Sequence, residues 1–288
     1  MTVPPTYGPT AWRGLLFVPA DRPSMLAKAQ SRGADALILD FEDAVHPDRK
    51  ESARTSVLES WENQELDGPA AVCVRINALD AGGQADLQTL VGCPVAAVIL
   101  PKASGSDDVA QARAAIDATV GPQTGLIPQI ETVAGVLDAR DVVGGPGGIA
   151  AVAFGGEDFA ADLGVGRSAG SLELLFPRTC IALWARRIGV PAIDTVFTDL
   201  ADRDGLVRET RLAAQLGFTG KLLVHPTQVQ PVIEVLTPVA ADVDHAVRIL
   251  EAAASSARER DGVVVVDGRM VDAPVVAQAE RVVARSRR

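Results

Sequence analysis

Residues 34–45, ADALILDFEDAV, contain the pattern that decides the fold of this chain. An apolar run at 36–39 has no polar alternation, and three acidic residues, Asp40, Glu42 and Asp43, follow it almost directly. A short continuous run of this kind is typical of a parallel strand that is covered by helices on both faces. The stretch therefore predicts a buried parallel strand whose carboxyl end carries carboxylates.

Short runs rich in valine, isoleucine, leucine and alanine recur along the chain. Eight can be counted, at residues 14–18, 36–39, 71–76, 96–100, 125–130, 149–154, 192–197 and 221–224. Helix-like segments such as PSMLAKAQSRG and DGLVRETRLAAQLGF separate them, with apolar positions recurring every three or four residues. Eight such units predict an α/β fold, a closed TIM (β/α)8 barrel over residues 13–228. A doubly wound open sheet is disfavoured because the first run ends in FVPADRPS, which is no glycine-rich phosphate loop.

The two ends of the chain do not follow this repeat. Residues 1–12 are expected to form an N-terminal arm. After residue 228, a helix-like DVDHAVRILEAAASSARER leads into the strand-like GVVVVDGRMVD and a helical tail. Because a closed barrel has no place for a ninth strand, we expect residues 229–288 to form a C-terminal helical and strand extension that packs outside the barrel.

Composition narrows the class of protein. With 288 residues, 48% of them hydrophobic, and a mean hydropathy of +0.18, the chain can bury a large core. A net charge of −10 argues against nucleic-acid or anionic-membrane partners. Three cysteines, Cys73, Cys93 and Cys180, lie far apart, which fits neither a disulfide framework nor a zinc site. With no leader-like start or long apolar stretch, we expect a soluble cytoplasmic protein.

The chemistry of a TIM barrel lies where its strands end. Polar or ionisable residues follow almost every run: Asp40, Glu42, Asp43, Arg75, Asn77, Lys102, Glu131, Glu157, Asp158, Asp199 and His225. So many carboxylates at one rim repel each other unless a cation lies among them, and Mg²⁺ prefers oxygen ligands and needs only one or two carboxylates. Glu131 and Asp158, from adjacent strands, suit direct ligation, and Glu42 and Asp43 suit the waters around the metal.

Two basic residues at the rim have alternative interpretations. Arg75 can clamp a substrate carboxylate with two hydrogen bonds, or it can pair only with Asp40 or Glu42. Lys102 could form a Schiff base, but a carboxylate-rich rim would raise its pKa and keep it protonated, which disfavours that chemistry.

Ten segments, taken together and in order, resemble the citrate lyase β-subunit family and the related malyl-CoA and citramalyl-CoA lyases of the HpcH/HpaI aldolase superfamily. They are RGLLFVPADRP, ADALILDFEDAV, VCVRINALD, VILPKA, GLIPQIETVAGV, VAFGGEDFAADLG, RSAGSLELLFPR, AIDTVFTD, LGFTGKLLVHPTQV and DGRMVDAPV. The resemblance implies a Mg²⁺ site, with Mn²⁺ as an alternative, ligated by Glu131 and Asp158. It also implies a substrate-binding Arg75 and supporting acids at Glu42 and Asp43.

The same resemblance implies a reaction. A 3-hydroxyacyl thioester of the citryl, malyl or citramalyl type would be cleaved to an acetyl thioester and a 2-oxo acid, with the thioester on CoA or on an acyl-carrier protein. Asp272, in the DGRMVD segment, would close over a neighbouring subunit's mouth as general acid/base, which implies a homotrimer or hexamer. Substrate contacts are expected from Arg75, Glu131, Arg22 and Lys28. The last two are the nearest candidates to bind the CoA phosphates, and the alternative is that they are ordinary surface charges.

Two other functions stay open at this point. One is a class II pyruvate aldolase that acts on free 2-oxo acids and aldehydes, and Asp272 with its segment argues for the thioester branch instead. The other is a non-catalytic subunit that docks a carrier beside α- and γ-type citrate lyase subunits.

Overall fold

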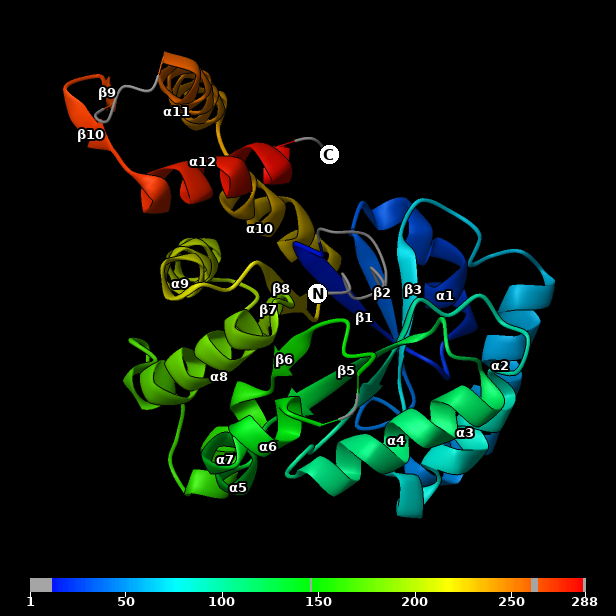
Figure 1. Cartoon of the computed structure of the whole chain (residues 1–288). Helices are drawn as coiled ribbons and strands as arrows, with labels where there is room; N and C mark the ends of the chain where they lie inside the picture. The colour runs from blue at the N-terminus through cyan, green and yellow to red at the C-terminus, as the bar shows by residue number, and fades with distance from the viewer. Residues whose placement is uncertain (1–11, 146, 260–263, 287–288) are drawn as a thin grey trace. The chain divides into compact units, whose positions relative to one another are not determined.

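The structure is a computed structural model that describes residues 12–145, 147–259 and 264–286. Eight strands, each parallel to its neighbours, form a closed barrel in chain order (Figure 1). They are β1 (Gly14–Pro19), β2 (Ala36–Asp40), β3 (Ala71–Arg75), β4 (Ala97–Leu100), β5 (Gly125–Ile130), β6 (Val152–Phe154), β7 (Ala192–Asp194) and β8 (Gly220–Leu223). Since β1 pairs with both β2 and β8, the ring has no open edge, and the predicted barrel is confirmed.

Two strands, β6 and β7, are three residues shorter than the apolar runs that predict them. The run at 149–154 keeps only Val152–Phe154 in the ladder, preceded by an isolated bridge between Leu126 and Ile149. The run at 192–197 ends its strand at Asp194, and the next two residues line a cavity instead. Apolar character at these positions therefore reflects burial rather than strand pairing.

Helices follow the strands around the barrel (Figure 1). They are α1 (Pro23–Ala29), α2 (Lys50–Glu62), α3 (Gly83–Thr89), α4 (Ser106–Thr119), α5 (Val133–Leu137), α6 (Ala139–Val143), α7 (Gly156–Leu163), α8 (Leu175–Ile188), α9 (Arg203–Leu216) and α10 (Val229–Leu236). The predicted helix in DGLVRETRLAAQLGF is α9, and it stops at Gly217, whose φ of +107° is one that glycine adopts without strain. None of the helices within the described ranges is long and apolar enough to cross a membrane.

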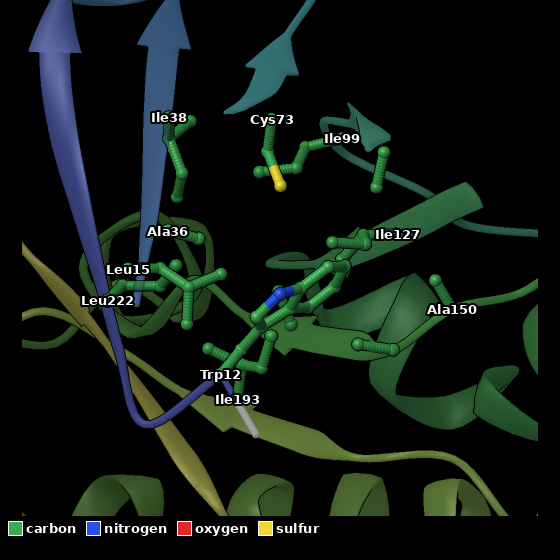
Figure 2. Close-up of a cluster of buried hydrophobic side chains, with 13 residues drawn as sticks. Trp12, Leu15, Ala36, Ile38, Cys73, Ile99, Ile127, Ala150, Ile193 and Leu222 are labelled. Atoms are coloured by element: carbon green, nitrogen blue, oxygen red, sulfur yellow. The ribbon is translucent and has the colours of Figure 1, made fainter. Parts of the chain in front are cut away.

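The interior of the barrel is filled by side chains (Figure 2). Alternate strand residues, among them Leu15, Ile38, Cys73 and Ile127, meet around the indole ring of Trp12, which is 2% exposed. Of the N-terminal arm expected at residues 1–12, only Trp12 lies within the described residues. The barrel is therefore a packed core and not a pore.

A group of buried charges lies on the outer side of β7 and β8. Arg178, Asp194, Glu209 and Lys221, called the paired cluster below, connect these strands to α8 and α9. Arg178 Nε lies 2.7 Å from Asp194 Oδ1, and Lys221 Nζ lies 2.8 Å from Asp194 Oδ2 and 2.9 Å from Glu209 Oε1. The strand residues next to Asp194 and Lys221 belong to the barrel core, so these two side chains point the other way, toward the helices.

The chain divides between Ile233 and Glu234 into two compact units, and the second has its own small core. It contains α11 (Ala240–Glu259), β9 (Val264–Val266), β10 (Arg269–Val271) and α12 (Ala273–Ser286), with α11 packed on α12. The stretch expected as one strand is an antiparallel hairpin, so that expectation was wrong. Its turn is Asp267 and Gly268, with φ values of +50° and +76°, as a two-residue type I′ turn requires.

Candidate functional site

A cavity of about 380 Å³ lies at the carboxyl ends of the barrel strands. It is lined by Phe17, Pro19, Asp40, Asp43, Ala44, Arg75, Gln129, Gly155, Glu157, Asp158, Thr195, Val196, Leu222 and Val224. Asp40, Arg75 and Gln129 lie two residues beyond strand positions that point into the barrel core, so the alternation of the strands directs them to the same axis. The fold thus delivers these side chains to one mouth.

Arg75 and Asp40 form the centre of this mouth. They are direct partners in the register of β2 and β3. Arg75 Nε donates to Asp40 Oδ1 at 2.8 Å and Nη2 donates to Oδ2 at 2.6 Å, a two-bond pairing between guanidinium and carboxylate. Nη1 lies 2.9 Å from Glu42 Oε2 and 3.7 Å from Asp43 Oδ2. One edge of the guanidinium is therefore fully used within the protein.

The surroundings keep Arg75 charged and in place. Burial lowers its pKa, but the hydrogen bonds and charge of Asp40, with the charges of Glu42 and Glu131, outweigh burial and raise it. The guanidinium also stacks over the ring of Phe17, 4.8 Å from its centroid. A fixed cation of this kind can bind an anionic group without rearrangement.

Asp40 also shapes the loop that carries the next two acids. Its Oδ1 accepts a hydrogen bond from the backbone N–H of Glu42 at 2.9 Å, and its Oδ2 accepts one from Ala44 at 3.2 Å. The sequence analysis noted Asp40 as a strand-end acid and as one of two alternative partners of Arg75. Cross-strand pairing of the last residues of β2 and β3 was the signal that could have assigned it to Arg75.

Glu131 is buried, with 1% of its surface exposed, at the end of β5. Its Oε1 accepts the backbone N–H of Lys102 at 2.8 Å, and its Oε2 accepts the side-chain amide of Gln129. Burial, together with the nearby charges of Glu42 and Asp158, raises the pKa of Glu131 to about 7, although the hydrogen bonds from Gln129 and Lys102 act in the opposite direction. Among the residues that the structure describes, Glu131 forms no ion pair, although its charge acts on Arg75 and Lys102.

Gly155 makes room for that carboxylate. A Cβ atom at this position would lie 2.2 Å from Glu131 Oε2, which is shorter than any ordinary contact. Any larger residue would displace Glu131, so glycine is required where β6 leads into α7.

Lys102 joins two of the acids. Its backbone is left-handed, with φ +51°, and this places its N–H on Glu131 while its Nζ donates to Glu42 Oε1 at 2.9 Å. The hydrogen bond to Glu42 raises the pKa of Lys102, as expected for a carboxylate-rich rim. A protonated, ion-paired amine is a poor nucleophile, which argues against a Schiff base.

Asp158 lies in the first turn of α7 and lines the cavity. That turn is held by Thr195, whose Oγ1 accepts the backbone N–H of Gly156 at 2.7 Å. Glu157, next to Asp158, is used differently, because it pairs with Arg167. Thr195 was missed by the sequence analysis, since it lies inside an apolar run.

The donor set fits a hard divalent cation. Within the described part of the chain, no group of three or more histidine, cysteine, aspartate or glutamate side chains is arranged to hold a metal. Mg²⁺ does not need three, because it binds through one or two carboxylates and completes its shell with water or substrate oxygens. Glu131 and Asp158 supply two carboxylates as oxygen donors. The charge of Asp158 contributes to the raised pKa of Glu131, and a cation bound between the two would remove this repulsion.

We call the seven residues around this site the mouth cluster: Asp40, Glu42, Asp43, Arg75, Lys102, Glu131 and Asp158. Gln129 was missed in the sequence although it lies in the same place. Its Oε1 is buried and has no hydrogen-bond partner among the residues that the structure describes. Gln129 lies in an otherwise apolar strand. Only the alternation of β5, which directs every second side chain from Ile127 onward into the barrel, could have identified Gln129 as a site residue.

Several other predicted site residues lie elsewhere. Arg22 precedes α1 and Lys28 lies in its last turn; both are exposed, and neither lines the cavity. Asp272 is exposed at the start of α12 in the second unit, where its Oδ1 accepts the backbone N–H of Val275 at 3.2 Å. His225 caps the 3₁₀ turn Pro226–Gln228, which is a structural role.

Comparison with known proteins bears on what this mouth does. The model of the HpcH/HpaI aldolase/citrate lyase family matches residues 13–226. The citrate lyase subunit beta of Escherichia coli is 36% identical, over 95% of this chain and 93% of that protein. The mitochondrial citramalyl-CoA lyase of Rattus norvegicus is 32% identical, over 94% of this chain and 85% of that protein.

Solved structures agree with these relatives. Protein CitE of Mycobacterium tuberculosis, in complex with magnesium, acetoacetate and coenzyme A, superposes with a TM-score of 0.78 at 33% identity, over 96% of this chain and 98% of that one. The citrate lyase beta subunit of the same organism, with oxaloacetate and magnesium, gives a TM-score of 0.68 at 33% identity, over 79% and 98%. With its barrel, its acid-rich mouth and a family match over most of its length, the chain belongs to the HpcH/HpaI aldolase/citrate lyase family.

Proposed function

We propose that this protein is a Mg²⁺-dependent carbon–carbon lyase that cleaves a 3-hydroxyacyl thioester to an acetyl thioester and a 2-oxo acid. The observation that carries the proposal is the mouth cluster, where a buried Glu131 with a pKa of about 7 and a neighbouring Asp158 lie beside a fixed Arg75. The names of the relatives, and the magnesium and coenzyme A bound by CitE, support the same reaction.

Glu131 and Asp158 would hold the metal, with Mn²⁺ as an alternative to Mg²⁺. When bound, the cation supplies polarisation of the oxygen that becomes the keto group. Gly155 and the backbone N–H of Lys102 fix the Glu131 carboxylate for this purpose. Metal binding would also favour the ionised form of Glu131.

Arg75 would bind the carboxylate of the substrate next to the carbinol carbon. Its Nε and Nη2 are held by Asp40, so Nη1 is the atom directed to the substrate, beside Glu42. Neutralising that carboxylate favours cleavage, because electron density moves toward the thioester enolate during the reaction. Glu42, held by Arg75 and Lys102, would orient waters at the metal.

Cleavage removes the proton of the carbinol hydroxyl, and the enolate of the departing acetyl thioester takes up a proton, so the reaction needs a group that can act as both general base and general acid. We assign this step to Asp272 of a neighbouring subunit, in a homotrimer or hexamer, with residues 234–288 covering that subunit's mouth. The exposure of Asp272 supports this role, since an exposed carboxylate is free to reach a partner. Arg22 and Lys28, both exposed, would meet the phosphates of CoA. The three cysteines of this protein are free thiols, which fits a cytoplasmic location.

The test is a thioester panel. Malyl-, citramalyl- and citryl-CoA are incubated with the protein and Mg²⁺, and the 2-oxo acid released is trapped and measured. We expect turnover of at least one, and Glu131→Ala and Asp158→Ala should each lower both activity and Mn²⁺ affinity by more than about 100-fold with the fold intact. Asp199→Ala is the matched control, because Asp199 is an exposed rim acid that does not line the cavity.

Two outcomes would overturn the proposal. One is the absence of 2-oxo acid from all three thioesters while an acyl-carrier protein binds tightly, which would favour a carrier-docking subunit. The other is normal activity in either alanine variant, which would show that the ligand assignment is wrong. Cleavage of free hydroxy-oxo acids in preference to thioesters would instead identify an aldolase.

A further inference from the structure

We infer that Arg167 determines which of two adjacent acids on α7 reaches the metal, and that it thereby favours Mg²⁺ over Ca²⁺ at the barrel mouth. It does so by engaging the carboxylate of Glu157, so that Asp158 alone is left for the metal. Arg167 is thus a specificity-determining residue that acts through Glu157. This inference rests on the metal site of the proposed function and adds a selectivity to it.

Two acids compete for the same place. Glu157 and Asp158 follow one another in the first turn of α7, both are half-buried, and both line the cavity. With Glu131 they would offer a cation three carboxylates, which is more than the one or two that Mg²⁺ usually takes. A site for Mg²⁺ therefore gains from a device that withholds one of the two.

The carboxylate of Glu157 is withheld by an ion pair. Its Oε1 accepts a hydrogen bond from Nη1 of Arg167, a residue that follows α7 and is not among those that line the cavity. Within the described residues, this is the one ion pair of Glu157, and Asp158 forms none. The two neighbours are therefore treated differently by the protein before any metal binds.

Arg167 is held in place by further partners. Its Nη2 lies 3.2 Å from Oε2 of Glu209, and the same nitrogen donates to Ser171 Oγ at 3.2 Å. Its Nε lies 3.3 Å from Oε1 of Glu173. Glu209 is a member of the paired cluster, where its Oε1 lies 2.9 Å from Nζ of the buried Lys221. The guanidinium is thus anchored to the charged layer outside the barrel.

The loop that carries Arg167 is also fixed. Ser171 is 4% exposed, has a left-handed backbone with φ +49°, and donates from Oγ to Glu209 Oε2 at 2.8 Å. Glu173 accepts the backbone N–H of Ser168 at 3.0 Å. A non-glycine residue keeps such a backbone only where its surroundings hold it, so the loop presents Arg167 in one position.

Loss of Arg167 would affect Glu157 more than the other two acids. Glu209 keeps Lys221, and Glu173 keeps its hydrogen bonds from Ser168. Glu157 would lose its one ion pair among the described residues and could turn into the cavity that it already lines. An added carboxylate favours Ca²⁺, which takes roughly six to eight oxygen ligands, over Mg²⁺, which requires a smaller octahedral shell and keeps several waters.

The experiment measures the dissociation constants of Mg²⁺ and Ca²⁺ for the full chain by titration calorimetry, without thioester. We expect Arg167→Met to raise the affinity for Ca²⁺ relative to Mg²⁺ at least about tenfold, with the fold intact by circular dichroism. Arg167→Lys, which keeps a cation, should restore most of the wild-type ratio. Arg208→Met is the matched control, since it breaks an exposed ion pair with Asp202 outside the cavity lining and should leave the ratio unchanged.

Two further variants test the role of Glu157 itself. The double variant Arg167→Met with Glu157→Gln should return to the wild-type ratio, because the freed carboxylate is gone. Glu157→Gln alone should change the Mg²⁺ affinity by less than about fivefold, because Glu157 is not a ligand in the wild-type protein. This single variant keeps the inference testable even if Arg167→Met does not fold.

The outcomes separate the inference from the proposed function. An unchanged ratio in folded Arg167→Met, a changed ratio that persists in the double variant, or a loss of Mg²⁺ affinity above about tenfold in Glu157→Gln would each overturn the inference and leave the lyase function standing. Turnover of no thioester, combined with the expected metal ratios, would overturn the lyase function alone. Binding of neither cation by the wild-type protein would overturn both.

Discussion

The paired cluster and the mouth cluster are both buried groups of charges on the same barrel, yet they are balanced in opposite ways. In the paired cluster, burial raises the pKa values of Asp194 and Glu209, but Lys221 and Arg178 outweigh it and lower both. In the mouth cluster, burial prevails and the pKa values of Glu131 and Glu42 are raised. Buried carboxylates whose cations outweigh burial contribute to structure, whereas a carboxylate such as Glu131, for which no ion pair is found within the described residues, is prepared for a ligand.

The largest effect should come from unbalancing the paired cluster. Asp194→Asn leaves Arg178 and Lys221, whose side chains are fully buried, with Glu209 as their remaining carboxylate. We expect the free energy of unfolding to fall by about 3–5 kcal/mol, measured by urea titration, with unchanged Mg²⁺ affinity in the folded protein.

Glu51→Gln is the control for that variant. The Glu51 side chain is 88% exposed in its ion pair with Arg54, so its loss should cost less than about 1 kcal/mol. A cost in Asp194→Asn as small as this control would contradict the distinction between the two clusters.

The second effect concerns the pH dependence of the metal-free protein. The pKa of Glu131 is raised from about 4.5 to about 7, so the folded state keeps a proton that the unfolded state releases. This contribution to stability is fully present below pH 4.5 and is lost as the pH rises to 7, a loss of about 3 kcal/mol at 1.36 kcal/mol per pH unit.

Comparison with Glu131→Gln isolates this contribution. Between pH 4.5 and 7 the wild-type protein should lose stability relative to the variant, and Mg²⁺ should recover the loss in the wild-type protein only. A constant difference across that pH range would mean that Glu131 is not the uncompensated acid.

The smallest effect tests the one lysine of the mouth cluster. Lys102→Met removes the hydrogen bond to Glu42, and because the Lys102 side chain is half exposed we expect only about a tenfold loss in kcat/KM for the cleaved thioester. Lys102→Arg should restore most of it. Full activity in Lys102→Met would show that Glu42 needs no cation from this side.

Sequence reasoning reached the barrel and most of the mouth because both depend on local signals. Burial accounts for the eight apolar runs, and strand geometry places the polar residues that follow each run in the sequence at one rim. What it missed depends on pairing between strands or on backbone shape. The sequence left open whether Arg75 pairs with Asp40, because that pairing follows from the register of β2 and β3. The left-handed backbone of Lys102 was missed, because nothing in the sequence marks such a conformation at a lysine.

The paired cluster and the hairpin were missed for different reasons. Asp194 and Lys221 lie within apolar runs, where a charge can be recognised as buried only once its helical partners are known. The hairpin turn at Asp267 and Gly268 was readable, since Asp-Gly between apolar residues is a strong turn signal, and the single-strand interpretation overlooked it.

Trp12 and the side chains around it fill the barrel beneath the mouth, so the cavity opens at one end. Two fragments formed at the bottom of such a pocket must leave through the same opening. The packed core beneath the mouth therefore makes substrate entry and product release share one opening.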